Sequence, residues 1–161
     1  MTDFSTTPSA EAAATPPNQG GEFVCKTADE TFELGESLGR YLRGGEAVLL
    51  YGRLGAGKTL LTKGILNALE FDIDEVTSPS FTLVNLYKTG KFDVYHIDLW
   101  RLDGGDAASA VGLDEILDDD NAVTIIEWAD RLDNGSIPAN AIRVKIDGDG
   151  DEPRNIHIDS K

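Results

Sequence analysis

Positive charge is scarce in this chain. Lysine and arginine together number 14 among 161 residues, against 29 aspartates and glutamates, and the formal net charge is −15. A surface of this kind repels phosphate backbones and anionic lipid headgroups. Broad electrostatic docking onto RNA, DNA or a membrane through this chain alone is therefore not expected.

Other absences bear on location. The single cysteine, Cys25, excludes an intrachain disulfide and fits a reducing compartment. No apolar run approaches the roughly 18 residues that a membrane-spanning helix needs. The N-terminus has neither the basic start nor the apolar core of a secretory signal. The expected location is the cytoplasm, with no membrane partner.

The first 21 residues have hardly any apolar bulk and consist largely of Thr, Ser, Ala, Pro and Gly. Such a segment cannot offset the entropy lost on ordering, so we expect residues 1–21 to form a disordered tail. The remaining residues, 22–161, are enough for one domain with a sizeable core.

The first half of this domain alternates helices and a buried strand. A capping box at residues 27–30 and apolar residues at helical spacing predict a helix that ends at Gly44-Gly45. Residues 47–51 are a continuous apolar run, which is typical of a strand buried on both faces. Leucines and isoleucines at helical spacing over residues 60–69 predict the next helix.

Strands dominate the second half. Residues 81–87 and 92–99 predict an antiparallel hairpin, and a helix is expected over residues 106–117. Residues 122–126 form another buried strand, and residues 141–147 pair with residues 155–159. The predicted fold is a three-layer α/β domain with a mixed, partly parallel sheet and antiparallel C-terminal strands.

A glycine-rich loop follows the first buried strand. Residues 52–59, GRLGAGKT, fit the pattern G-x-x-x-x-G-K-[ST] without a mismatch. Glycines let successive backbone N–H groups wrap a phosphate, and the helix that follows adds its positive N-terminal end. Lys58 would reach the β- and γ-phosphates, and the Thr59 hydroxyl would complete a Mg²⁺ shell. The alternative, a flexible turn that carries Lys-Thr by chance, is weaker because a strand precedes the loop and a helix follows it.

Two acids stand at the ends of apolar strands, where ligands of open α/β sheets bind. Glu127 closes the strand 123–126 in the Walker B pattern, and Asp98 closes the strand 94–97. The alternative for each is a strand-end acid that faces water. His96 lies on the same strand face as Asp98 and could share a hydrogen-bond network with it, although such a histidine is more often structural than catalytic.

Four segments together resemble one family. They are residues 52–59 (GRLGAGKT), 77–83 (TSPSFTL), 96–102 (HIDLWRL) and 126–128 (IEW). In this order and spacing they are similar to the TsaE family, also called YjeE, small bacterial P-loop ATPases of the tRNA threonylcarbamoyladenosine pathway. The similarity extends over about residues 27–158 and implies that 22–161 is a P-loop ATPase domain.

The resemblance implies a role for each matching residue. Thr59 and Glu127 would hold Mg²⁺, Asp98 would be an acid needed for activity, and residues 78–81 would sense the γ-phosphate. Trp128 matches the aromatic residue beside the metal acid. The residues that would contact the nucleotide are Thr27, Gly52, Gly55, Ala56, Gly57, Lys58, Thr59, Leu60, Trp128 and Arg154.

The implied cofactors are ATP and Mg²⁺. The implied partners are the enzyme pair that transfers the threonylcarbamoyl group onto the adenosine next to the anticodon, with tRNA reached indirectly through that pair. Turnover of the chain alone should be slow. Two departures from the family pattern are visible: Arg53 stands where Asp is usual, and Trp100 where Tyr is usual.

Three other functions also use a phosphate loop, but the rest of the sequence fits them less well. A small-molecule kinase generally closes an arginine-bearing lid over the phosphates, whereas the seven arginines here are scattered. A signalling GTPase would carry an N-K-x-D element, which the sequence lacks. A scaffold that only binds nucleotide would need neither Asp98 nor Glu127 for its function.

Overall fold

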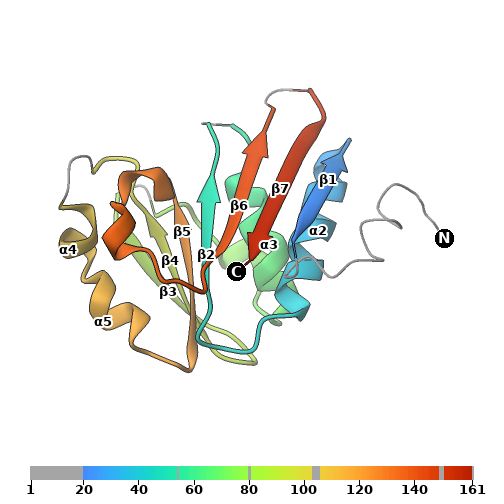
Figure 1. Cartoon of the computed structure of the whole chain (residues 1–161). Helices are drawn as coiled ribbons and strands as arrows, with labels where there is room; N and C mark the ends of the chain where they lie inside the picture. Colours follow the sequence, from blue (N-terminus) through green and yellow to red (C-terminus); the bar gives the residue numbers. More distant parts are fainter. Residues whose placement is uncertain (1–19, 54, 80, 103–105, 149–150, 161) are drawn as a thin grey trace.

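The structure, a computed structural model, describes residues 20–53, 55–79, 81–102, 106–148 and 151–160. Its centre is a seven-stranded sheet with the strand order β1-β7-β6-β2-β5-β4-β3 (Figure 1). The strands are β1 (Gly21–Cys25), β2 (Ala47–Tyr51), β3 (Val84–Lys88), β4 (Asp93–Asp98), β5 (Ala122–Glu127), β6 (Ile142–Asp147) and β7 (Arg154–Ser160).

The sheet is mixed, as predicted. The four central strands β6, β2, β5 and β4 run parallel to one another. At one edge β7 and β1 add antiparallel strands, and at the other edge β3 pairs antiparallel with β4. The predicted hairpin and the predicted pairing of the last two strands are both confirmed.

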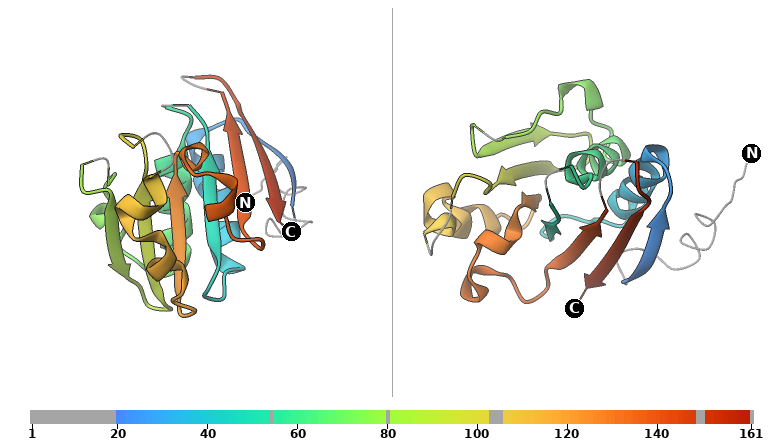
Figure 2. Two further views of the ribbon diagram at one scale, coloured as in Figure 1. Left: turned by 60° about the vertical axis from the view of Figure 1, so that its left-hand side comes forward. Right: turned by 90° about the horizontal axis from the view of Figure 1, so that it is seen from above.

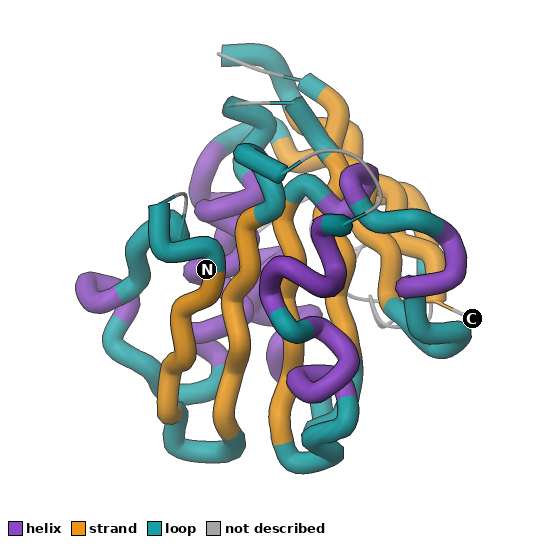
Figure 3. The backbone as a smooth tube through the Cα atoms, turned by 90° about the vertical axis from the view of Figure 1, so that its left-hand side faces the viewer, coloured by secondary structure: helices purple, strands orange, loops and turns teal. Residues whose placement is uncertain are grey.

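Helices cover both faces of the sheet, which gives three layers (Figure 2). The longer helices α2 (Ala28–Arg40) and α3 (Lys58–Ala68) lie on one face, and the short helices α4 (Ala107–Val111) and α5 (Leu113–Leu117) lie on the other (Figure 3). Alternate residues of β2 therefore enter different cores. Val48 and Leu50 pack in the α2–α3 cluster, whereas Ala47 and Leu49 pack in the α4–α5 cluster.

Helices α2 and α3 pack with their backbones in close approach because glycines line the contact. A Cβ atom at Gly64 of α3 would overlap the carbonyl oxygen of Phe32 in α2. One at Gly35 of α2 would overlap the carbonyl oxygen of Leu61 in α3. The close packing holds α3, and with it the loop at its N-terminus, firmly against the rest of the fold.

The start of α2 differs slightly from the predicted capping box. Thr27 Oγ1 accepts a hydrogen bond from the Glu30 amide at 3.1 Å, as expected of an N-cap. The Glu30 carboxylate, however, accepts from the amide of Lys26 at 2.7 Å and not from that of Thr27. Tyr41, the residue just beyond the end of the helix, is 39% exposed.

Three element predictions need correction. Helix α2 ends at Arg40, before the predicted stop at Gly44-Gly45. The helix expected over 106–117 is divided at Gly112, whose φ of 68° is left-handed and separates α4 from α5. The strand expected from residue 81 begins only at Val84, because Leu83 has a φ of 70° and cannot continue the extended backbone. Phe81 is consequently 82% exposed.

The predicted N-terminal tail lies outside the described residues up to residue 19. From Gly21 onward the chain already forms β1, which pairs with β7 (Gly21 opposite Ile158). None of the helices in the described part of the chain has the length and apolar character that crossing a membrane requires.

Candidate functional site

The glycine loop joins the end of β2 to the start of α3, as the sequence predicts. Gly57, with a φ of 107°, is the N-cap of α3, and Gly55 also has a left-handed φ, of 84°. Residues other than glycine rarely adopt these backbone angles, so the loop can turn sharply into the helix only with glycine at both positions. Lys58, Thr59 and Leu60 then form the first turn of α3, whose backbone amides make up the positive end of the helix dipole. Residue 54 lies outside the described residues.

Lys58 is buried, although its side chain is charged. Its Nζ donates hydrogen bonds to the carbonyl oxygens of Gly52 at 2.5 Å and Arg53 at 2.9 Å. The same Nζ lies 4.2 Å from the centre of the Trp128 ring, which is within cation–π range. Burial lowers the pKa of Lys58, while the nearby carboxylates of Glu127 and Asp98 act in the opposite direction. The cation is thus held in a poorly solvated position directly beneath the loop.

The strand register brings the two predicted acids to the level of the loop. Glu127 at the end of β5 lies between Leu50 of β2 and Asp98 at the end of β4. Both carboxylates are about 3% exposed, so neither is a strand-end acid that faces water. Asp98 accepts hydrogen bonds from the amide of Trp100 at 2.8 Å and from the Ser78 hydroxyl at 3.5 Å.

A pocket lies between the loop and these strand ends. Its lining comprises Gly55, Gly57, Lys58, Thr59, Leu60, Ser78, Glu127 and Trp128. The donors suit a phosphate chain, since they combine helix N-terminal amides with an ammonium group. They also suit Mg²⁺, which takes few protein ligands and relies on phosphate and water oxygens. One hydroxyl, from Thr59, and one carboxylate, from Glu127, meet that need. Among the described residues no group of three or more His, Cys, Asp and Glu side chains could hold a metal by itself.

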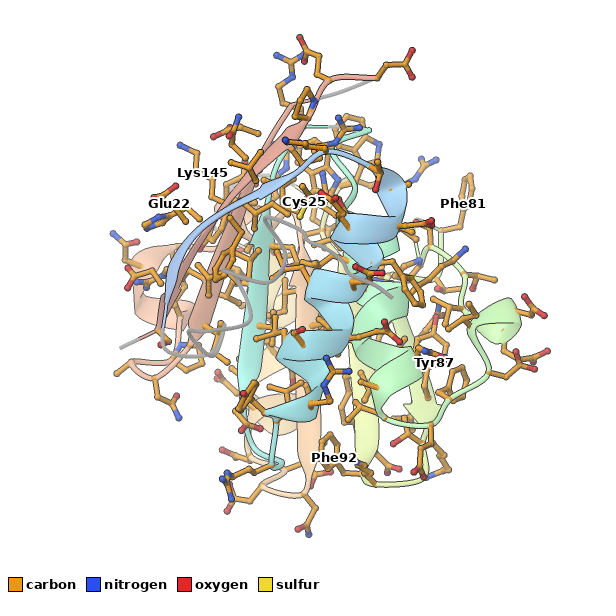
Figure 4. All side chains as sticks on the ribbon, turned by 90° about the vertical axis from the view of Figure 1, so that its right-hand side faces the viewer. Glu22, Cys25, Phe81, Tyr87, Phe92 and Lys145 are labelled. Atoms are coloured by element: carbon orange, nitrogen blue, oxygen red, sulfur yellow. The ribbon has the colours of Figure 1, made fainter. Side chains whose placement is uncertain are left out.

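A second pocket adjoins the first through Gly57 and Leu60, which line both. It is enclosed by the end of β1, the start of α2 and the turn before β7. Figure 4 shows Cys25 there, where β1 meets α2. Its lining comprises Cys25, Lys26, Thr27, Ala28, Thr31, Gly57, Leu60, Asp151, Glu152 and Arg154.

Arg154 fixes the loop from the side of this second pocket. Its Nε donates to the carbonyl oxygen of Ala56 at 2.8 Å, and Nη2 donates to that of Gly55 at 3.2 Å. The guanidinium thus bridges β7 and the glycine loop, which are about a hundred residues apart in the chain. All the predicted site residues that the structure describes, from Thr27 to Arg154, line or adjoin these two connected pockets, with Asp98 one strand away and hydrogen-bonded to Ser78.

The sequence and the structure of the chain are both similar to those of known proteins. Residues 25–156 match the model of a family described as threonylcarbamoyl adenosine biosynthesis protein TsaE. The chain belongs to the TsaE family. The TsaE protein of Mycobacterium leprae is 39% identical over 121 residues, 71% of this chain and 74% of that protein. The Aquifex aeolicus TsaE is 35% identical over 68% of this chain and 77% of its own length.

A third relative and a solved structure extend the match. The Treponema pallidum TsaE is 33% identical over 84% of this chain and 97% of its own length. The crystal structure of Bacillus subtilis YdiB superposes with a TM-score of 0.68 at 25% identity, and covers 89% of this chain and 87% of that chain. The likeness therefore includes the fold as well as the motifs.

Two features of this TsaE-family chain were not predicted from the sequence. His96 lies against Glu127 and not against Asp98: its Nε2 is 2.6 Å from Glu127 Oε2. The sequence placed His96 and Asp98 on one strand face, but it did not show which strand lies beside them. Only the pairing of β4 with β5 reveals this contact.

The second feature is an aromatic and cationic cluster beside the phosphate pocket. The rings of Trp100 and Trp128 have their centres 4.5 Å apart, and the Arg131 guanidinium lies 5.7 Å from the centre of the Trp128 ring. Trp128 has a left-handed φ of 59°, which turns its side chain from the end of β5 back toward Lys58. The spacing of Arg131, three residues after Trp128, is the only sequence signal that could have suggested this cluster.

Proposed function

We propose that this chain binds Mg-ATP in the two connected pockets and hydrolyses it to support the threonylcarbamoyl modification of tRNA adenosine. The observation that carries the proposal is the position of Glu127. A buried carboxylate at the end of β5 lines the same pocket as the glycine loop, Lys58 and Thr59. That arrangement is the one that nucleoside triphosphate hydrolysis requires.

Different loop residues bind different parts of Mg-ATP. The amides of residues 55–60 cradle the phosphates, and Lys58 exchanges the carbonyls of Gly52 and Arg53 for phosphate oxygens. The Thr59 hydroxyl and the Glu127 carboxylate hold Mg²⁺, which when bound neutralises charge that develops on the phosphates. Trp128 packs beside Lys58 and limits the access of water to it.

Asp98 acts on the segment that follows Thr77. It accepts hydrogen bonds from the Ser78 hydroxyl and the Trp100 amide, so it connects residues from two loops to the end of β4. We assign it the role of orienting the attacking water or the residues that contact it. Residue 80, at the centre of the expected γ-phosphate sensor, lies outside the described residues.

The second pocket is assigned to the nucleoside. Thr27 and Arg154 both line it, and Arg154 also holds the loop through its hydrogen bond to the carbonyl oxygen of Ala56. The acidic groups Asp151 and Glu152 at its rim favour hydroxyl and amino donors, as a ribose and an adenine present, over a further phosphate.

The family supports the proposed partners. The TsaE relatives are named for tRNA threonylcarbamoyladenosine biosynthesis. With a net charge of −15, this chain is suited to reach tRNA through the threonylcarbamoyl-transferase protein pair and not by itself. We assign this role in tRNA modification to the cytoplasm, where tRNA is modified.

The experiment is a measurement of ATP turnover by the protein alone, with each transferase protein, and with the pair plus tRNA. We expect slow turnover alone and stimulation by the pair, because partner proteins commonly complete such sites. A lack of stimulation in every mixture would contradict the proposed role. Phosphoryl transfer from ATP to a metabolite in place of water would instead indicate a small-molecule kinase.

A further inference from the structure

The contact between His96 and Glu127 is buried on all sides. The side chain of His96 is fully buried, and that of Glu127 is 4% exposed. Their atoms Nε2 and Oε2 are 2.6 Å apart, within the range of a strong hydrogen bond to a carboxylate. The contact gives the buried carboxyl group of Glu127 a hydrogen-bond partner, which offsets the cost of removing a polar group from water.

The hydrogen-bond partners assign the tautomer of His96. A carboxylate oxygen can only accept, so Nε2 carries the hydrogen and its N–H donates a hydrogen bond to Glu127 Oε2. The other ring nitrogen, Nδ1, is buried and has no hydrogen-bond partner among the described residues. A bare lone pair there costs less than an unpaired N–H, which favours the tautomer with its N–H on Nε2.

Packing alone does not account for a histidine here. The His96 ring lies 6.0 Å from the ring of Tyr87 on the α2–α3 side of the sheet, where its neighbours on β4 and β5 include Val94 and Ile125. An apolar residue of similar volume would fill this space without leaving Nδ1 unpaired. The histidine is therefore explained by what its Nε2 does to Glu127.

We propose that His96 is a positioning residue for the magnesium-binding carboxylate. By holding Oε2 of Glu127, it selects one side-chain rotamer and leaves Oε1 free to turn toward Thr59 and the phosphates. This inference rests on the proposed function, because it assigns Glu127 to Mg²⁺. Hydrogen-bonding partners of metal ligands commonly change metal affinity by about 10- to 100-fold when they are removed.

The test compares two amides of different reach. In His96→Gln the amide nitrogen lies about where Nε2 was and can still donate to Glu127, whereas in His96→Asn it lies nearer the position of Nδ1 and cannot. The probe is the nonhydrolysable analogue adenosine 5′-(β,γ-imido)triphosphate, titrated calorimetrically at a series of MgCl₂ concentrations and in EDTA. We expect the Asn variant to need about 10- to 100-fold more Mg²⁺ for half-maximal enhancement of binding. We expect the Gln variant to stay near the parent, and all three proteins to bind the metal-free analogue equally.

Each other outcome has a definite meaning. An Asn variant with the Mg²⁺ dependence of the parent overturns the proposal, and so does one whose metal-free affinity falls by the same factor, since His96 would then only shape the pocket. If the Asn variant does not fold, His96→Leu takes its place under the same criteria. If nucleotide binding by the parent protein does not depend on Mg²⁺, the proposed function fails together with this inference. The outcomes above contradict the inference alone, so the two failures can be distinguished.

Discussion

The ammonium group of Lys58 lies 4.2 Å from the centre of the Trp128 ring, while it donates hydrogen bonds to two carbonyls of the loop. A lysine that contacts phosphate oxygens cannot keep all these partners. Nucleotide binding should therefore change the surroundings of Trp128, and the fluorescence of the chain offers a direct measure because it contains only two tryptophans.

We expect the intrinsic fluorescence to change when Mg-ADP or an ATP analogue is added. The change should disappear in Trp128→Phe and persist in Trp100→Phe, because only Trp128 lines the phosphate pocket. The measurement is a fluorescence titration of the three proteins. A full response from the Trp128 variant would place the nucleotide elsewhere.

Lys58 should also decide whether nucleotide stabilises the fold. A ligand at 100 times its Kd adds about 2.7 kcal/mol to the free energy of unfolding, which for a chain of this size raises Tm by roughly 5–10 °C. We expect this shift for the parent and its loss in Lys58→Ala. Lys63→Ala is the matched control, since Lys63 lies on the same helix outside both pockets. Equal shifts in the two variants would contradict the assignment of the loop.

The parts of this site that depend on neighbours in sequence could be predicted from the sequence, and those that depend on strand order could not. The strand, loop and helix around Lys58 follow from one continuous pattern, so their bounds agree with the structure to within two residues. The break at Gly112 was missed because apolar spacing continues across it, and a glycine within a helical pattern is locally tolerated. His96 and Glu127 are 31 residues apart, and only the adjacency of β4 and β5 brings them together.

Loss of the carboxylate at Asp98 should separate hydrolysis from binding. Asp98→Asn keeps the shape of the side chain but removes the carboxylate, which accepts hydrogen bonds from the Trp100 amide and the Ser78 hydroxyl. We expect partner-stimulated turnover to fall by about 100-fold or more, with nucleotide affinity changed little. Asp93→Asn, at the other end of the same strand, is the control and should retain turnover. A retained turnover in the Asp98 variant would show that hydrolysis does not depend on this carboxylate.

The close packing of α2 against α3 leads us to a prediction about stability. Gly64→Ala would place a methyl group against the carbonyl oxygen of Phe32, so α2 and α3 must move apart. We expect a net destabilisation of about 1–3 kcal/mol, measured by urea unfolding, although alanine favours a helix intrinsically. Gly135→Ala is the matched control, because a Cβ atom there meets nothing closer than Asp133 at 3.9 Å. Its stability should equal or slightly exceed that of the parent.

Cys25 provides a pH-dependent test of the second pocket. Burial, as the largest cause, raises the pKa of its thiol from 9.0 to about 11. At pH 8 the folded protein should therefore contain about 100-fold less thiolate than the unfolded chain, and it should react correspondingly more slowly with a disulfide reagent. The protonated thiol is the form that the fold favours, so this contribution to stability is complete below pH 9 and is lost as the pH rises toward 11.

Because Cys25 lines the pocket assigned to the nucleoside, saturating Mg-ATP should slow the reaction further. Modification of the folded protein at the rate of the urea-unfolded chain would contradict the buried position of the thiol, and a rate that nucleotide leaves unchanged would contradict the assignment of the pocket.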